Sequence, residues 1–226
     1  RRLQSFTEME LEKTADGSYT LYVPEMVEHY HPGKGALTEW QHIFIDKGLK
    51  HSSVLHPRIL EIGLGTGLNC FLTLLAAEET GRKVHYTGIE RYPLPEETIL
   101  KLDYPSIIGL GHEEDYAAIH RSPWGQDVAL TPWFTLHKIA GDFTQYKFEK
   151  GYDIVYFDAF APEKQPEMWD QKLFDSLYEC LNNGGILTTY CAKGVVRRML
   201  QSSGFVVERL AGPPGGKREI LRATKQ

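Results

Sequence analysis

The sequence of 226 residues lacks the features that mark several classes of protein. No apolar run approaches the roughly 18 residues of a membrane-spanning helix, and residues 1–12 mix charged and apolar side chains too evenly for a signal peptide. Cysteine is scarce, and Cys70, Cys180 and Cys191 are widely spaced, which favours buried free thiols over a disulfide framework. These absences predict a soluble cytoplasmic protein with no membrane contact.

Metal-ligand patterns and a strong basic charge are also missing. His29 and His31 have no third ligand at a usable spacing, so we expect no metal. The net charge of -5 does not indicate a nucleic-acid binder, although basic residues gather after Cys191. That cluster predicts either a local basic surface or an ordinary solvated one. It consists of Lys193, Arg197, Arg198, Arg209, Lys217, Arg218, Arg222 and Lys225.

The sequence does contain a repeated alternation of strand and helix patterns. We predict helices near residues 68–78, 169–181 and 195–202, and strands at 58–62, 84–89, 134–139, 153–157, 186–190, 205–210 and 219–223. Alternation of this kind indicates an α/β, Rossmann-like fold with a mostly parallel sheet of seven strands. The last two strands should form an antiparallel hairpin, because the linker 212–216 is too short for a crossover helix.

Two additions surround this predicted core. Residues 1–50 should form an extension with a β-hairpin at 9–23 and a helix at 36–49. Residues 91–131 are broken by prolines into short apolar helical pieces and should form a helical insertion between the second and third core strands. We therefore expect one catalytic domain over residues 1–226.

A glycine-rich turn follows the first core strand. Gly63, Gly65 and Gly67 lie at alternate positions, which lets the backbone turn sharply and approach a ligand closely. A dinucleotide fingerprint needs glycine at position 68, where this sequence has leucine, and the lysine of a phosphate-binding loop is absent. The turn, which continues to Asn69, therefore favours S-adenosyl-L-methionine over a nicotinamide cofactor.

Carboxylates follow three successive strands. We expect Glu61 either to contact the methionine end of the cofactor or to hold the glycine loop in shape. Glu90 should accept hydrogen bonds from the ribose hydroxyls, Asp142 from the adenine amino group, and Phe143 should pack on the adenine ring. One such residue alone is more often a helix cap, so the prediction depends on the series.

The fourth strand ends in Asp158, followed by Phe160 and Pro162. In an open parallel sheet this position borders the ligand crevice, so we predict that Asp158 faces the methyl group and that Asp158 and Phe160 are catalytic. An acidic residue followed by an aromatic residue and a proline is similar to the signature of amine methyltransferases, which indicates a nitrogen acceptor. The alternative for Asp158 is a helix N-cap. We also expect Tyr30 and Glu39 to belong to a segment that closes over the site.

Four motifs together resemble one family. They are residues 30–39, residues 61–69, residues 158–169 and residues 215–219, and the match extends over residues 20 to 224. The sequence is similar in these motifs to the methyltransferase module of the tRNA 5-methylaminomethyl-2-thiouridine biosynthesis enzymes. The resemblance implies methylation of the aminomethyl nitrogen at C5 of the wobble uridine, with S-adenosyl-L-homocysteine as product.

The resemblance also implies a tRNA partner. Lys193, Lys217 and Arg218 would then contact tRNA phosphates, with Tyr30 and Pro162 near the substrate. In bifunctional members the module is fused to a flavin-dependent oxidoreductase, and this sequence ends at Gln226 with no FAD domain. We therefore expect a stand-alone version supplied with aminomethyl-uridine tRNA by a separate enzyme. Two other functions stay open: an aminopropyltransferase resembling spermidine synthase, and a non-catalytic module.

Overall fold

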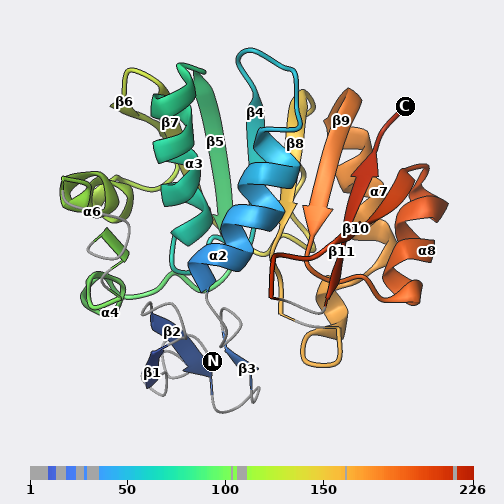
Figure 1. Cartoon of the computed structure of the whole chain (residues 1–226), viewed down its shortest axis with the longest axis horizontal. Helices are drawn as coiled ribbons and strands as arrows, with labels where there is room; N and C mark the ends of the chain where they lie inside the picture. Colours follow the sequence, from blue (N-terminus) through green and yellow to red (C-terminus); the bar gives the residue numbers. More distant parts are fainter. Residues whose placement is uncertain are drawn as a thin grey trace.

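The computed structural model describes residues 10–13, 19–23, 28–29, 36–102, 104–105, 111–160, 162–215 and 218–226. Its centre is one large sheet (Figure 1). The strands of this sheet are β4 (Arg58–Ile62), β5 (Val84–Glu90), β6 (Asp127–Thr131), β7 (Phe134–Ala140), β8 (Tyr152–Phe157), β9 (Leu181–Thr189), β10 (Val206–Ala211) and β11 (Glu219–Thr224).

The strand order is β10-β11-β9-β8-β4-β5-β7-β6. Strand β4 pairs in parallel with β5 and β8, β5 with β7, and β8 with β9. At the opposite side of the sheet β11 is antiparallel to both β9 and β10, which confirms the predicted C-terminal hairpin. The carboxyl ends of β4, β5 and β8 therefore lie at one edge of the sheet. The turns that follow these strands contain the predicted site residues.

The prediction of seven strands is wrong by one. Strand β6 lies within residues 91–131, which we expected to be helical, and pairs antiparallel with β7. Its five residues are too short and too exposed for a clear alternation pattern to identify them as a strand. A tight connection at 132–133, in which the Trp133 amide donates to Thr131 Oγ1 at 3.1 Å, returns the chain alongside β7.

Helices cover both faces of the sheet. The helix α2 (Ala36–Trp40), the π-helix η1 (Gln41–Leu49) and α3 (Leu68–Thr80) pack on one face, whereas α7 (Gln171–Cys180) and α8 (Gly194–Ser203) pack on the other. The predicted helix at 36–49 is confirmed in extent, but most of it has the wider π geometry. A short 3-10 helix, η2 (Pro166–Met168), precedes α7.

The insertion and the N-terminal extension complete the described elements. Within 91–131 the chain forms α4 (Glu96–Leu100) and α6 (Glu113–Arg121) before β6. The predicted hairpin is present as β1 (Glu10–Lys13) and β2 (Tyr19–Val23), and β3 (Glu28–His29) adds a third strand to it. Its predicted turn at 14–18 lies outside the described residues, as does the segment 30–35.

An apolar core lies on each face of the sheet, between the strands and the helices that cover them. Ile59, Tyr86 and Tyr156 belong to the core beneath α3, and Leu60 and Val155 belong to the core beneath α7. The three cysteines are buried and free, as predicted. No helix among the described residues is long and apolar enough to cross a membrane.

Candidate functional site

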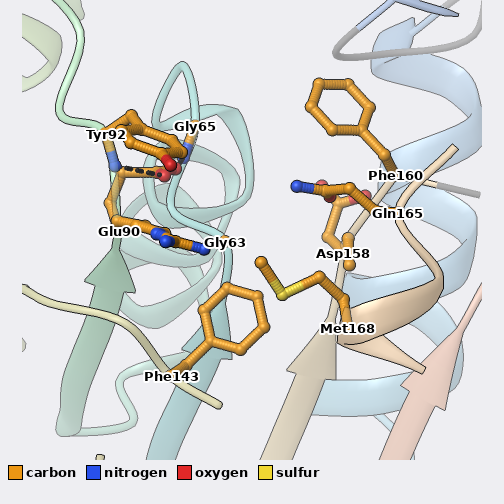
Figure 2. Close-up of a pocket in the computed structure, with 11 residues that line it drawn as sticks. Gly63, Gly65, Glu90, Tyr92, Phe143, Asp158, Phe160, Gln165 and Met168 are labelled. Atoms are coloured by element: carbon orange, nitrogen blue, oxygen red, sulfur yellow. Dashed lines mark hydrogen bonds between the residues drawn. The ribbon is translucent and has the colours of Figure 1, made fainter. Parts of the chain in front are cut away.

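A pocket lies at the carboxyl edge of the sheet, between the turns that follow β4, β5 and β8 (Figure 2). Glu90 and the glycine loop form one wall, and Asp158, Phe160 and Gln165 form the opposite wall. Phe143 and Met168 approach each other below them. The full lining is Gly63, Gly65, Glu90, Arg91, Tyr92, Phe143, Asp158, Ala159, Phe160, Gln165 and Met168.

The glycine loop lies tightly against the Asp158 segment. Gly63, Gly65 and Gly67 have φ values of 88°, 55° and 78°, which are unfavourable for residues with a Cβ. A Cβ on Gly63 would lie 2.9 Å from the backbone oxygen of Asp158, closer than real Cβ atoms approach. Glycine at 63 therefore allows the two walls of the pocket to meet.

Glu90 is a buried carboxylate held by backbone groups. Its Oε1 accepts from the Gly65 amide at 2.8 Å, and its Oε2 accepts from the Tyr92 amide at 3.1 Å. Burial raises the pKa of Glu90, while these backbone donors oppose that shift. Each carboxylate oxygen has a second acceptor position, so Glu90 can still accept hydrogen bonds from a ligand.

Glu61 lies behind the wall of the pocket rather than in its lining. The side chain is 1% exposed, and its two oxygens accept from Tyr86 Oη at 2.7 Å and Asn69 Nδ2 at 2.8 Å. The same Asn69 amide donates to Asp158 Oδ2 at 3.1 Å. Burial raises the pKa of Glu61 well above its ordinary value. Glu61 and Asn69 thus link β4 and α3 to Asp158 by hydrogen bonds.

Asp142 and Gly67 also lie outside the lining. Asp142 accepts from the backbone amide and hydroxyl of Thr144 at 2.9 and 2.6 Å, and the Arg91 guanidinium lies 3.7 Å away. Gly67 packs against the insertion, because a Cβ there would lie 2.8 Å from the His120 ring. Glu39, on α2, is partly buried.

The predicted substrate residues meet in a second pocket beside the first. Pro162, Lys193 and Arg218 line it together with Tyr190 and Cys191. Lys193 forms an ion pair with Glu163, which lines the same pocket. The other two predicted substrate residues, Tyr30 and Lys217, lie outside the described part of the chain.

Sequence reasoning missed five residues at or beside the first pocket. Arg91 and Tyr92 directly follow Glu90 in the sequence, so their place in the pocket could have been predicted from that position. Gln165 and Met168 reach the pocket through the turn before α7, which no local pattern predicts. Trp40 donates from Nε1 to Asp158 Oδ2 at 2.7 Å, across 118 residues of sequence.

Comparison with known proteins gives the family of this fold. A family described as S-adenosyl-L-methionine-dependent methyltransferase matches residues 123–226. The tRNA 5-methylaminomethyl-2-thiouridine biosynthesis bifunctional protein MnmC of Aeromonas hydrophila is 30% identical over 225 residues, which cover 89% of this chain and 34% of that protein. The corresponding protein of Idiomarina loihiensis is 31% identical over 85% of this chain and 34% of its own length. Over residues 123–226 this chain is therefore similar to the S-adenosyl-L-methionine-dependent methyltransferases, and over most of its length it is similar to the MnmC proteins.

Solved structures show that this chain shares its fold with two groups. The crystal structure of MNMC2 from Aquifex aeolicus has a TM-score of 0.76 and 24% identity, covering 96% of this chain and 70% of that one. Spermidine synthase from Thermotoga maritima has a TM-score of 0.64 and 11% identity, covering 96% and 69%. This chain spans about a third of the length of the MnmC proteins that it matches.

The pocket suits the cofactor of this family. A glycine-rich turn with positive φ values, a buried carboxylate and an aromatic ring together match a nucleoside, and a second carboxylate matches a nearby positive charge. Among the described residues no group of three or more His, Cys, Asp or Glu side chains is arranged to hold a metal ion.

Proposed function

We propose that this chain methylates the aminomethyl nitrogen at C5 of the wobble uridine in tRNA, forming 5-methylaminomethyluridine or its 2-thio form. The observation that carries this proposal is the position of Asp158, which lines the cofactor pocket opposite Glu90 and adjoins the second pocket through Ala159 and Tyr190. The similarity to MnmC proteins over most of the chain supports the choice of tRNA.

The cofactor lies across the carboxyl edge of the sheet in this proposal. Glu90 accepts hydrogen bonds from the ribose hydroxyls, and the backbone of Gly63 and Gly65 lies against the ligand. Phe143 packs on the adenine ring, and Asp142 accepts from the amino group beside it. Glu61 and Asn69 act from behind the wall by holding the glycine loop and Asp158 in place. Glu39 reaches the site from α2.

When bound, S-adenosyl-L-methionine would supply an electrophilic methyl group to the amine nitrogen, with the electron pair of the methyl–sulfur bond left on sulfur. Asp158 accepts a hydrogen bond from the amine and so directs the nitrogen lone pair toward that methyl group. Its negative charge also favours the ammonium product before the proton leaves to water. Phe160, on the same wall, excludes water from the amine.

The second pocket receives the substrate. Lys193 and Arg218 contact tRNA phosphates and Pro162 lies beside the uridine. The sequence predicts the same substrate role for Lys217 and Tyr30, which lie outside the described residues. A separate enzyme supplies the aminomethyl-uridine tRNA, and the reaction takes place in the cytoplasm with the tRNA.

The shared fold with spermidine synthase favours aminopropyl transfer as the second candidate. Undermodified tRNA carrying aminomethyluridine should accept tritium from methyl-labelled S-adenosyl-L-methionine, whereas polyamines with decarboxylated S-adenosylmethionine should give no product. Nucleoside analysis by mass spectrometry identifies the methylated base. Formation of an aminopropylated polyamine, together with unlabelled tRNA, would refute the proposal in favour of the second candidate. Failure to bind either nucleoside would refute both and indicate a non-catalytic module.

A further inference from the structure

Three aromatic side chains hold the segment that follows β8. Each donates a hydrogen bond to one of three consecutive residues, and we name Trp40, Tyr190 and Trp169 the aromatic clamp. The bonds run from Trp40 Nε1 to Asp158 Oδ2 at 2.7 Å, from Tyr190 Oη to the Ala159 carbonyl at 2.7 Å, and from Trp169 Nε1 to the Phe160 carbonyl at 2.6 Å.

The members of the clamp support one another. Trp40 and Tyr190 are stacked, with ring centroids 6.2 Å apart and an interplanar angle of 24°. Tyr190 and Trp169 meet edge to face at 6.2 Å and 85°. Trp40 is 1% exposed and Trp169 5% exposed, so neither indole can turn without displacing its neighbours.

Of the three members of the aromatic clamp, Trp40 donates to the side chain of Asp158, whereas Tyr190 and Trp169 donate to backbone carbonyls. The terminal torsion of an aspartate is broad, so the chain direction alone does not define the plane of its carboxylate. Two rigid donors on Oδ2, Trp40 Nε1 and Asn69 Nδ2, define that plane. Asn69 is held in turn by Glu61.

We propose that Trp40 is a positioning residue for methyl transfer, which sets the orientation of the Asp158 carboxylate through its indole N–H. This inference rests on the proposed function, in which that carboxylate directs the amine. Trp40 does not line the pocket, so it acts through Asp158 and leaves cofactor binding unaffected.

The kinetic test removes the N–H and keeps an aromatic ring. Trp40→Phe should lower kcat for methyl transfer to tRNA by roughly 10- to 100-fold, as expected for a small misplacement of a reacting group. KM for tRNA and Kd for S-adenosyl-L-homocysteine should change less than about twofold. Trp133→Phe, in the turn before β7, is the matched control and should behave like the wild type. In an Asp158→Asn background Trp40→Phe should have little further effect on kcat.

A spectroscopic test does not depend on the substrate. The chain contains four tryptophans, so a 15N-labelled sample should give four indole N–H signals. Trp40→Phe assigns one of them, and Asp158→Ala should shift that signal while the Trp124 and Trp133 signals stay in place. An unmoved Trp40 signal, or an unchanged kcat in a folded Trp40→Phe variant, would overturn the inference. Absence of methyl transfer by the wild type would instead refute the proposed function, and the indole test would still decide the contact.

Discussion

Substitution of Gly63 by alanine tests whether the two walls of the pocket depend on their close approach. Gly63 has a φ of 88°, and a left-handed backbone costs a residue with a Cβ about 1–2 kcal/mol. The new Cβ would also lie 2.9 Å from the Asp158 carbonyl oxygen, which is backbone and cannot swing aside. Such overpacking adds about 1–3 kcal/mol. Gly63→Ala should therefore lower the free energy of unfolding by roughly 2–5 kcal/mol.

The chain offers a control that separates these two costs. Gly81, at the C-terminal end of α3, has a φ of 66° and no atom within 4 Å of its added Cβ. Gly81→Ala should therefore show the backbone cost alone, about 1 kcal/mol, with unchanged affinity for the cofactor product. The difference between the two variants in free energy of unfolding measures the cost of the contact between the glycine loop and the Asp158 segment.

Two measurements decide the outcome. The midpoint temperature of thermal unfolding, Tm, should fall by roughly 5–12 °C for Gly63→Ala and by only a few degrees for Gly81→Ala. Relief of the overlap must move one of two walls that line the pocket, so Kd for S-adenosyl-L-homocysteine by calorimetry should rise at least about tenfold for Gly63→Ala. Equal Tm and Kd values for the two variants would refute the reasoning.

Three further predictions concern other parts of the molecule. Asp158→Ala should abolish methyl transfer to tRNA while calorimetry shows retained S-adenosyl-L-homocysteine binding; loss of the folded state instead would make the residue structural. Arg218→Glu should weaken tRNA binding in a filter assay and leave cofactor affinity unchanged. The control Lys83→Glu reverses an exposed charge just before β5 and should have little effect on tRNA binding. Equal losses of tRNA affinity in the two variants would show that Arg218 has no specific role in tRNA binding. Lys138→Met should raise the free energy of unfolding at pH 7, because the buried ammonium group opposes folding. Burial lowers the pKa of Lys138 to about 8 from 10.5, so the folded state binds its proton more weakly than the unfolded state. The advantage of the variant in urea unfolding should thus be full below pH 8 and disappear as pH rises toward 10.5, and a constant advantage would contradict this account.

Local sequence patterns were sufficient to predict the positions of most strands of the sheet. Strand β4 occupies the predicted residues 58–62, and β5, β7 and β8 begin or end within one residue of prediction. These strands are buried and β-branched or aromatic, so their pattern is strong in any window of sequence. Strand β6 was missed because an exposed edge strand of five residues has no such pattern and depends on pairing with β7.

The positions of Glu90 and Asp158 were also predictable, but their surroundings were not. Glu90 ends one buried strand and Asp158 directly follows another, and parallel strands bring their carboxyl ends to one edge of a sheet. The inward position of Glu61, by contrast, depends on Tyr86 from β5 and Asn69 from α3. Gln165 and Met168 reach the pocket through an irregular turn, whose path is set by packing.

The sequence alone therefore determined the fold class, the glycine turn and the order in which carboxylates follow the strands, because each is encoded by residues adjacent in the chain. The tertiary structure decided which groups hold those carboxylates. Trp40 and Asp158 are 118 residues apart, and their hydrogen bond exists only because the end of α2, together with η1, packs on the sheet beside β8. Such contacts depend on the relative placement of distant elements, which side-chain packing determines and local propensity does not.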